Sequence, residues 1–314
     1  AKATATLIII WLVFTWQFWL KGLVPAPLDF LVGFFAPWQE SYNLPIKNPA
    51  ISDIVNQIIP WKTFTIDQWK QGLVPLWNPY NFSGTPHAAN WQSAVFYPFN
   101  LLMIIFDFIT GWSLYVLLQP LLAGLFTYSY ARCLKLSPLS SLLSALSFAF
   151  SGFLTAWLEW GTLGHALLWL PLALWSIEKF HQTKNSIYYL LLAICLSLSL
   201  LAGHLQISLY VIILTCIYFL FRYQGHKKLI LTTILIIAPF LLTAFQFFPS
   251  LELYFHSLRS QTSTPGWFQI FRIPISGLVT FLAPDFFGHP ATSNSFSHFS
   301  YVEMMGYIGL ITML

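Results

Sequence analysis

The sequence predicts an all-α polytopic membrane protein, and three observations support this fold class. The 314 residues are 57% hydrophobic, 18% aromatic and only 8% charged, whereas charged residues make up about a quarter of a typical soluble domain. Several apolar segments reach the roughly 17 to 25 residues that a helix needs to cross a bilayer. The short connections between these segments are alternately basic and free of Lys and Arg, which is typical of a chain that crosses a membrane repeatedly.

The apolar segments define the predicted helices. Backbone amides in lipid have to be hydrogen-bonded within their own segment, so each apolar run is expected to be helical. We predict seven spanning helices and the start of an eighth near residue 304; the seven cover residues 4–20, 111–131, 138–158, 165–180, 187–202, 205–222 and 229–249. Because the last apolar run reaches residue 314, we expect residues 1–314 to be one transmembrane domain that is truncated at its C-terminus.

The basic residues predict the orientation of the chain. Three connections, residues 132–137, 178–186 and 222–228, carry Arg132, Lys135, Lys179, Lys184, Arg222, Lys227 and Lys228. By the positive-inside rule these connections face the cytoplasm, and so does the N-terminus. Nine of the ten carboxylates then fall on the other side, and only Glu178 stays inside. We therefore expect a multi-pass protein of the cytoplasmic (plasma) membrane with an extracytoplasmic active site.

Two long connections are predicted to lie outside the cytoplasm. They are residues 21–110, the first long connection, and residues 250–303, the second long connection. Both are rich in Pro, Gly, Asn and aromatic residues and lack the polar low-complexity sequence of a disordered linker, so we expect them to be folded and functional. Residues 94–109 are apolar but short and interrupted by Pro98, which predicts a short interfacial or re-entrant helix.

The composition argues against several kinds of site. The net charge of +4 is spread over short connections and forms no continuous basic face, so no nucleic-acid partner is expected. Cys133, Cys195 and Cys216 form no CxxC pattern, and the histidines form no HxxxH or HExxH pattern. Neither a disulfide framework nor a zinc site is therefore indicated. The expected partner of the apolar segments is the lipid bilayer.

A candidate general base lies in the first long connection. Asp53 and Gln57 are four residues apart, so a helix that begins near Ser52 places both side chains on one face. A carboxylate there can accept a proton from an acceptor hydroxyl while the neighbouring amide fixes its orientation. The spacing alone is equally compatible with a carboxylate that stabilises the first turn of a loop helix.

An ordered set of motifs resembles the YfhO-like bacterial membrane proteins of the GT-C glycosyltransferase superfamily. In the first long connection the motifs are Ser52-Asp53 with Gln57, Pro60-Trp61, Gly72 to Tyr80, Gly84-Thr85-Pro86, Gln92 and Tyr97-Pro98. Farther along they are Gly203 to Gln206, Gln246, Pro249, Glu252, Ser257, Arg259, Pro284 to Gly288, Tyr301, Glu303, Gly306, Tyr307 and Gly309. The resemblance covers most of the chain and implies a GT-C-like helix bundle with a large first extracytoplasmic loop.

The resemblance also implies a reaction. Enzymes of this superfamily transfer a sugar from a polyprenyl-phosphate carrier and keep an essential acidic residue in the first outer loop. Asp53 is the best match to that residue, and Asp29 is the second candidate because it lies nearer the first helix. The implied reaction is an inverting transfer, outside the cytoplasm, from the polyprenyl-phosphate sugar donor to a cell-envelope glycan, lipid or protein, with the aspartate as general base.

Groups that bind the leaving lipid phosphate are expected near the base, because negative charge develops on that phosphate. Arg259 and Arg272 are the arginines of the second long connection, and planar guanidinium groups suit phosphate. His204 and Gln206, at the junction of two predicted helices, and Gln57 would add hydrogen bonds. A lipid-headgroup anchor is an equally good interpretation of the two arginines, and a structural role is the alternative for His204.

Two further carboxylates are candidate acidic partners of Asp53. Asp285 and Glu303 lie in or at the end of the second long connection, and carboxylate oxygens are the preferred ligands of hard divalent cations. The spacing neither requires nor excludes such an ion, so the metal is left open. No other cofactor is expected.

Two other functions fit the same fold prediction. A transporter or flippase of lipid-linked saccharides would carry ionisable groups near the middle of the bilayer, and the middles of the predicted helices are nearly free of charge. A non-catalytic membrane assembly protein would keep the bundle and lack the activity. The sequence leaves the sugar, the acceptor and the oligomeric state undetermined.

Overall fold

The computed structural model describes residues 2–42, 44–261, 274–297 and 299–313, apart from the side chains of Arg259 and Gln261. Helices make up most of this part of the chain. Its sheet is a two-stranded antiparallel hairpin of β1 (Trp77–Asn78) and β2 (Thr85–Pro86). The predicted helical class is confirmed for these residues.

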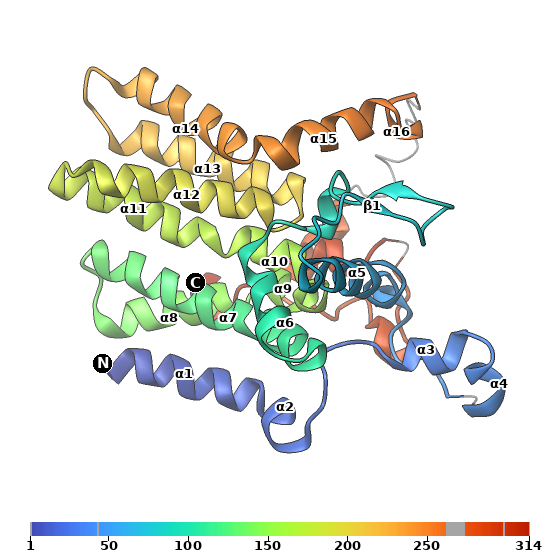
Figure 1. The fold of residues 1–314 in the computed structure, drawn as a ribbon. Helices are drawn as coiled ribbons and strands as arrows, with labels where there is room; N and C mark the ends of the chain where they lie inside the picture. Colours follow the sequence, from blue (N-terminus) through green and yellow to red (C-terminus); the bar gives the residue numbers. More distant parts are fainter. Residues whose placement is uncertain (1, 43, 262–273, 298, 314) are drawn as a thin grey trace.

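The long helices of the described chain lie side by side and form the body of the molecule (Figure 1). Helix α7 packs against α1, α8 and α11; α11 packs against α12 and α13; and α14 packs against α12 and α13. The bundle consists of α1 (Lys2–Phe14), α7 (Phe108–Cys133), α8 (Pro138–Ala149), α11 (Trp169–Thr183), α12 (Ser186–Leu201), α13 (Leu205–Arg222) and α14 (Lys228–Leu242).

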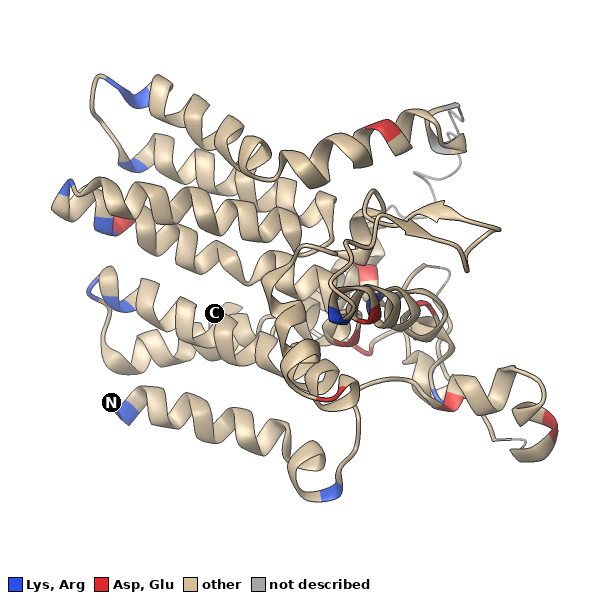
Figure 2. Cartoon of the chain, viewed as in Figure 1, with Lys and Arg blue, Asp and Glu red and all other residues tan. Residues whose placement is uncertain are grey.

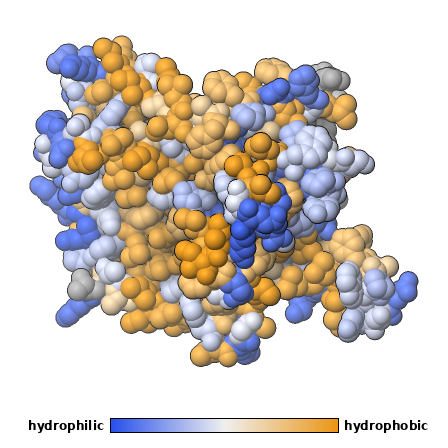
Figure 3. Space-filling model, in the orientation of Figure 1, coloured by the Kyte–Doolittle hydropathy of each residue, from blue (hydrophilic) through white to orange (hydrophobic). Residues whose placement is uncertain are grey.

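The bundle helices are apolar both toward the core and away from it. In α13, Val211 and Phe219 are fully buried, while Ile213, Ile217 and Phe221, at i, i+4 spacing, are more than half exposed. Figure 3 shows apolar surface over much of the bundle, with hydrophilic residues gathered along its left edge. Exposed apolar faces of this extent are typical of a surface that contacts lipid or another protein.

Three helical segments of the described chain are long and apolar enough to cross a membrane. They are Phe108–Cys133, Pro138–Ala156 and Leu205–Arg222, and the pair α14 and α15 would be a fourth if it counts as one span. The bounds predicted for 111–131 and 205–222 are thus confirmed within a few residues. The remaining predicted spans are short, because α1, α11, α12 and α14 each have between 13 and 16 residues.

Some of the predicted helices are broken in the structure. The first is split at Thr15 into α1 and α2 (Trp16–Lys21), and the third continues past α8 as α9 (Gly152–Ala156). The fourth is split into α10 (Thr162–Leu167) and α11, because Pro171 has no amide hydrogen to bond the carbonyl four residues earlier.

The helix predicted over 229–249 is not continuous in the structure. Helix α14 ends at Leu242, and α15 (Ala244–Phe255) follows at an angle of 81°. The bend lies between Pro239 and Pro249, each of which removes a helical hydrogen bond. Just beyond the bend, the buried Gln246 side chain donates a hydrogen bond to the Ala88 carbonyl at 2.6 Å, which holds α15 against the first long connection.

Charge separates the two ends of the bundle. Figure 2 shows lysines and arginines at the helix ends on the left and most carboxylates on the right. The left end, where α7 joins α8, α11 joins α12 and α13 joins α14, is called the basic end below. The two long connections lie at the opposite end (Figure 1).

The first long connection folds into short helices and the hairpin. Its elements are α3 (Asp29–Phe34), α4 (Trp38–Tyr42), η1 (Pro49–Ile51), the π-helical turn η2 (Ile54–Ile58), α5 (Ile59–Lys70), η3 (Trp91–Ser93), η4 (Pro98–Asn100) and α6 (Leu101–Ile105). The interfacial helix predicted over 94–109 corresponds to η4 and α6.

A second hydrophobic core anchors this connection to the bundle. Ile54, Ile58 and Ile66 from η2 and α5 are buried with Trp112 and Val116 of α7. The larger core lies among α7, α11, α12 and α13. Helix α5 is therefore fixed on the bundle end by apolar burial, which normally contributes about 1.5–3 kcal/mol for each large side chain.

The second long connection is held by short elements that return to the bundle end. They are α16 (Leu258–Gln261), η6 (Ile275–Phe281), η7 (Pro290–Thr292), η8 (Val302–Met304) and, after it, α18 (Leu310–Met313). The Thr280 hydroxyl donates to the Met304 carbonyl at 2.7 Å, which ties η6 to η8. The eighth helix predicted near residue 304 begins only at Leu310 in the described chain.

Candidate functional site

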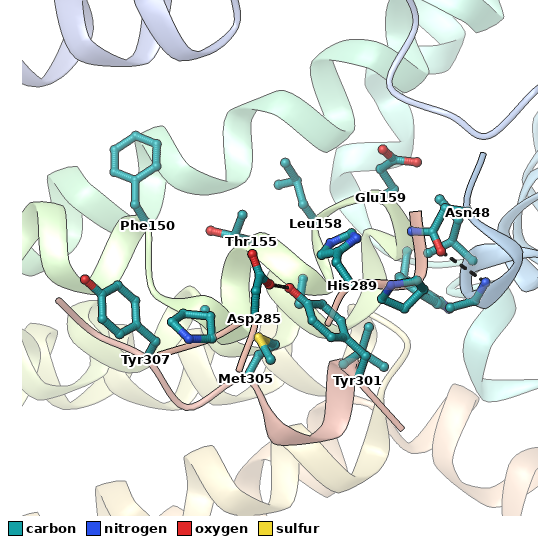
Figure 4. A pocket seen from close by; sticks show the side chains of 18 residues that line it. Asn48, Phe150, Thr155, Leu158, Glu159, Asp285, His289, Tyr301, Met305 and Tyr307 are labelled. Atoms are coloured by element: carbon teal, nitrogen blue, oxygen red, sulfur yellow. Dashed lines mark hydrogen bonds between the residues drawn. The ribbon is translucent and has the colours of Figure 1, made fainter. Parts of the chain in front are cut away.

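A cavity of about 480 Å³ lies where the two long connections meet the bundle. One wall comes from the first long connection at residues 48–51 and a second from residues 150–160, which include α9 and η5 (Leu158–Trp160). The third comes from residues 284–307 of the second long connection and the segment after it. Segments far apart in the sequence thus converge on one site, and Figure 4 shows their side chains around it.

The turn that carries Glu159 is held in place by the bundle. Gln119, buried in α7, donates a hydrogen bond to the Leu158 carbonyl at 2.9 Å. The next turn requires glycine, because Gly161 has a φ of +73° and a Cβ there would lie 2.4 Å from the Tyr115 ring. Glu159 is therefore presented by a fixed turn between two helices, a more precise support than a free loop.

Glu159 is the least solvated carboxylate of the cavity. Its Oε2 atom is buried and has no hydrogen-bond partner among the described residues. Burial raises the pKa of the carboxyl, and the negative charge of Asp29 raises it further. A carboxyl with a raised pKa that faces a cavity is typical of general acid–base sites.

The opposite wall carries a second carboxylate with an ordered environment. Asp285 accepts a hydrogen bond from the Tyr301 hydroxyl at 2.7 Å, drawn as a dashed line in Figure 4. The His289 ring packs edge-on against Tyr301, with 4.6 Å between the ring centroids. Because Tyr301 contacts both of the other residues, Asp285 has a fixed position although it is exposed to solvent.

Close backbone contact seals one side of the cavity. The Gly152 amide donates to the Tyr307 carbonyl at 2.6 Å, and a Cβ on Gly152 would lie 3.1 Å from the Met305 carbonyl oxygen. Ser151 caps the helix that begins here, with its hydroxyl accepting from the Leu154 amide. A residue without a side chain lets the segment after η8 lie directly on α9.

Asp53 and Gln57 lie outside this cavity. Their predicted pairing on one helical face is confirmed, because Gln57 Nε2 donates to Asp53 Oδ1 at 3.1 Å. Asp53 is exposed, however, and neither residue lines the cavity. Asp29 does not line it either; its Oδ2 accepts from the Lys47 amide at 2.7 Å. The role of Asp53 as general base stays a prediction.

The predicted phosphate ligands do not gather at this cavity in the described chain. His204 caps α13, its Nδ1 accepting from the Ile207 amide, and burial lowers its pKa to about 4. Gln206 is exposed and donates to the Tyr210 hydroxyl at 2.9 Å. Arg272 lies outside the described residues, and so does the side chain of Arg259.

The predicted acidic partners have different positions. Asp285 lines the cavity, whereas Glu303 is exposed and does not. Within the described part of the chain, no group of three or more His, Cys, Asp or Glu side chains is arranged to hold a metal ion. The described residues thus offer no preformed cage for the cation that the sequence leaves open.

Two residues of the site were not singled out from the sequence. Glu159 lies in the run Trp157-Leu158-Glu159-Trp160-Gly161 at the end of a predicted span. A carboxylate between two tryptophans at a predicted interface is the signal that could have found it. His289 stands next to Gly288, which closes the motif that begins at Pro284, but nothing in its spacing relates it to Tyr301.

Comparisons of the chain with protein-family models, with curated proteins and with solved structures find no match.

Proposed function

We propose that the chain is a membrane glycosyltransferase. It takes a sugar from a polyprenyl-phosphate donor and transfers it, with inversion, to a glycan, lipid or protein of the cell envelope on the extracytoplasmic side. The observation that carries this proposal is the cavity between the two long connections, which has the Glu159 and Asp285 carboxylates on its walls.

The distribution of charge supports the orientation in this proposal. The short connections at the basic end carry seven of the 14 lysines and arginines, while the cavity lies at the opposite end of the bundle. Under the positive-inside rule, this arrangement gives an extracytoplasmic cavity. Nucleotide sugars are made in the cytoplasm, so a site on the other side needs a donor that has already crossed the membrane, such as a lipid-phosphate sugar.

The proposed reaction is a single displacement. The acceptor oxygen forms a bond to the anomeric carbon as the bond from that carbon to the phosphate oxygen breaks, and the phosphate leaves with the electron pair. The proton of the acceptor hydroxyl goes to a carboxylate of the cavity. General-base assistance of this kind normally contributes about 10²- to 10⁴-fold in rate.

The bundle helices give less support to a transporter. In the described residues of α7, α11, α13 and α14, charged side chains lie within the first or last two turns. Glu178 at the basic end is neutralised by Arg222, whose Nε lies 2.5 Å from its carboxylate. Ionisable groups on a transport path are expected near the middle of the span.

Transfer assays with matched variants test the proposal. The full-length protein, reconstituted in vesicles, is given a radiolabelled polyprenyl-phosphate hexose and a cell-envelope fraction as acceptor. We expect Glu159→Gln or Asp285→Asn to lower the rate by about 10²-fold or more. Glu252→Gln, an exposed acid of α15 outside the cavity, should leave the rate unchanged.

The Asp53→Asn variant separates the two assignments of the base. Full activity in this variant, together with loss in a cavity variant, is the expected result. If transfer disappears in Asp53→Asn and persists in both cavity variants, the reaction takes place elsewhere. No transfer by the wild-type protein with any polyprenyl-phosphate sugar would favour a transporter or an assembly protein.

A further inference from the structure

The polar groups of the cavity have an unusual balance of charge for a site that handles a phosphate donor. Two carboxylates face it, from Glu159 and Asp285, and the other polar groups include the Asn48 amide, the His289 ring and the Tyr301 hydroxyl. Among the described residues that line it there is no lysine and no arginine. The walls therefore carry net negative charge, apart from any proton bound to a carboxylate.

A phosphate would be repelled by these walls. Two like charges about 4 Å apart cost on the order of 4 kcal/mol at the effective dielectric constant near a protein surface. The Asp29 carboxylate adds to this field, because its charge acts on Glu159. An uncharged ligand that offers hydroxyl groups avoids the repulsion and can donate hydrogen bonds to the carboxylates.

We infer that this cavity is the subsite for the acceptor, that it binds an uncharged saccharide, and that Glu159 accepts a hydrogen bond from a saccharide hydroxyl. The inference rests on the proposed function and deepens it, because it assigns the acceptor to this cavity and the phosphate of the donor to a different site. The phosphate of the donor is bound by groups outside this cavity.

The surroundings of Glu159 fit this role. Glu159 lines the cavity, and its buried Oε2 atom has no hydrogen-bond partner in the described structure, so its carboxylate lacks a donor and favours a ligand that can supply one. Apolar side chains line the same wall, including Phe150, Leu158 and Trp160, and such groups suit the C–H faces of a sugar ring. The volume of about 480 Å³ falls within the usual range of small-molecule sites.

A cation is the other ligand that negative walls attract. Glu159, Asp285 and His289 share this cavity, but within the described part of the chain no three His, Cys, Asp or Glu side chains are arranged to hold a metal ion. Hard cations such as Ca²⁺ take six or more oxygen ligands, and structural sites usually supply several of them from carboxylates. The saccharide is therefore the better fit.

Binding measurements without any lipid donor test the inference independently of transfer. The full-length protein in detergent micelles is titrated with methyl hexosides, methyl N-acetylhexosaminides and the corresponding hexose 1-phosphates, and binding is followed by saturation-transfer NMR. We expect at least one neutral glycoside to bind in this cavity, and each sugar phosphate to bind there roughly tenfold more weakly or not at all.

Three variants assign the binding to this cavity. Glu159→Gln keeps the shape and removes the charge, and it should weaken binding roughly tenfold or more, as expected for loss of a hydrogen bond to a charged group. Thr155→Trp places a large ring in the cavity from an exposed position on its wall, so it should abolish binding without removing a charge. Glu252→Gln, at the exposed acid of α15 outside the cavity, is the control and should bind like the wild type.

The outcomes distinguish this inference from the proposed function. Sugar-phosphate binding that is tighter than neutral binding and that Thr155→Trp abolishes, or neutral binding that neither Glu159→Gln nor Thr155→Trp changes, would overturn the inference even if transfer is observed. Neutral binding that both variants weaken supports it, including in a protein that transfers no sugar, in which case the proposed function fails and a saccharide-binding cavity remains.

Discussion

Glu159 and Asp285 illustrate what the sequence can and cannot predict for single residues. Asp285 was predicted as a candidate acidic residue because its motif is recognisable along the chain, and it lines the cavity. Glu159 was missed, because its significance comes from burial and from the approach of Asp29, which depend on the fold. The exposure of Asp53 could not be predicted either. Helical spacing shows which residues share a face of the helix, but not which other segments pack over that face.

The glycine after the η5 turn gives the first residue-scale prediction. Gly161→Ala forces an alanine into a φ of +73° and brings its Cβ to 2.4 Å from the Tyr115 ring. We expect a loss of stability of about 1–3 kcal/mol from the backbone strain alone, with an added loss from the clash, and reduced transfer because Glu159 moves. Thermal unfolding in detergent and the transfer assay measure both effects.

Gly72→Ala is the matched control for this prediction. Gly72 has the same φ of +73°, but nothing lies within 4 Å of an added Cβ. Its variant should therefore show the backbone cost without the clash and with normal transfer. Equal losses of stability in the two variants would mean that the Tyr115 contact does not fix the turn.

The hydrogen bond to Asp285 gives a second prediction. Tyr301→Phe removes the hydroxyl that donates to Asp285 at 2.7 Å and keeps the ring against His289. Since a hydrogen bond to a charged group contributes about 1.5–3 kcal/mol, we expect transfer to fall roughly tenfold with little change in folding. Tyr307→Phe, on the same cavity wall, is the comparison, and a similar fall in both variants would argue against a specific role of Tyr301.

Helix α5 contains a buried lysine that makes its packing sensitive to pH. Lys62 is fully buried, and its Nζ donates to Asn100 Oδ1 at 2.8 Å and lies 5.1 Å from the centre of the Tyr115 ring. Burial lowers its pKa to about 7, whereas an exposed lysine has a pKa of about 10.4. The pKa of nearby His87 is lowered to about 4, mainly by burial, so His87 stays neutral in this range.

The sign of the pH effect follows from proton binding. Below pH 7 Lys62 is charged in both states, so the full cost of burying the charge opposes folding. Between about pH 7 and 10.4 the unfolded chain binds the additional proton, so the folded state gains stability as pH rises. We expect a gain on the order of 1–4 kcal/mol over this window, seen as a rising unfolding temperature.

Two variants isolate the contribution of Lys62. Lys62→Met should remove most of the pH dependence, while Lys70→Met, at an exposed position on the same helix, should keep it. If the wild type and Lys62→Met show the same profile, the buried amine is not the titrating group.

The helices of the bundle also show where sequence patterns fail. The length of the apolar segment predicted the bounds of α7 and α13 well, since each is a single continuous helix. The 81° bend between α14 and α15 was not predicted, because the sequence is apolar on both sides of Thr243. What holds the bend is a contact between distant segments, the hydrogen bond from Gln246 to the Ala88 carbonyl, and single-sequence periodicity carries no information about it.

At the scale of the whole molecule, charge pattern is the property that the sequence predicted best. Every second connection between the predicted helices is basic, and Figure 2 shows these basic connections together at one end of the bundle. The convergence of three distant segments on one cavity could not be predicted, because it depends on how the long connections fold back. The cavity lies at the end of the bundle opposite the basic connections.

Cysteine labelling measures the side of the membrane on which this cavity opens. Cys133, partly exposed at the basic end, is first replaced by serine, and Cys195 and Cys216 are buried. Thr155→Cys then places a single accessible thiol on the cavity wall. We expect a membrane-impermeant maleimide to label this thiol in intact cells, and to label Cys133 of the otherwise wild-type protein only after permeabilisation. Labelling of the Thr155→Cys thiol only in permeabilised cells would contradict the account.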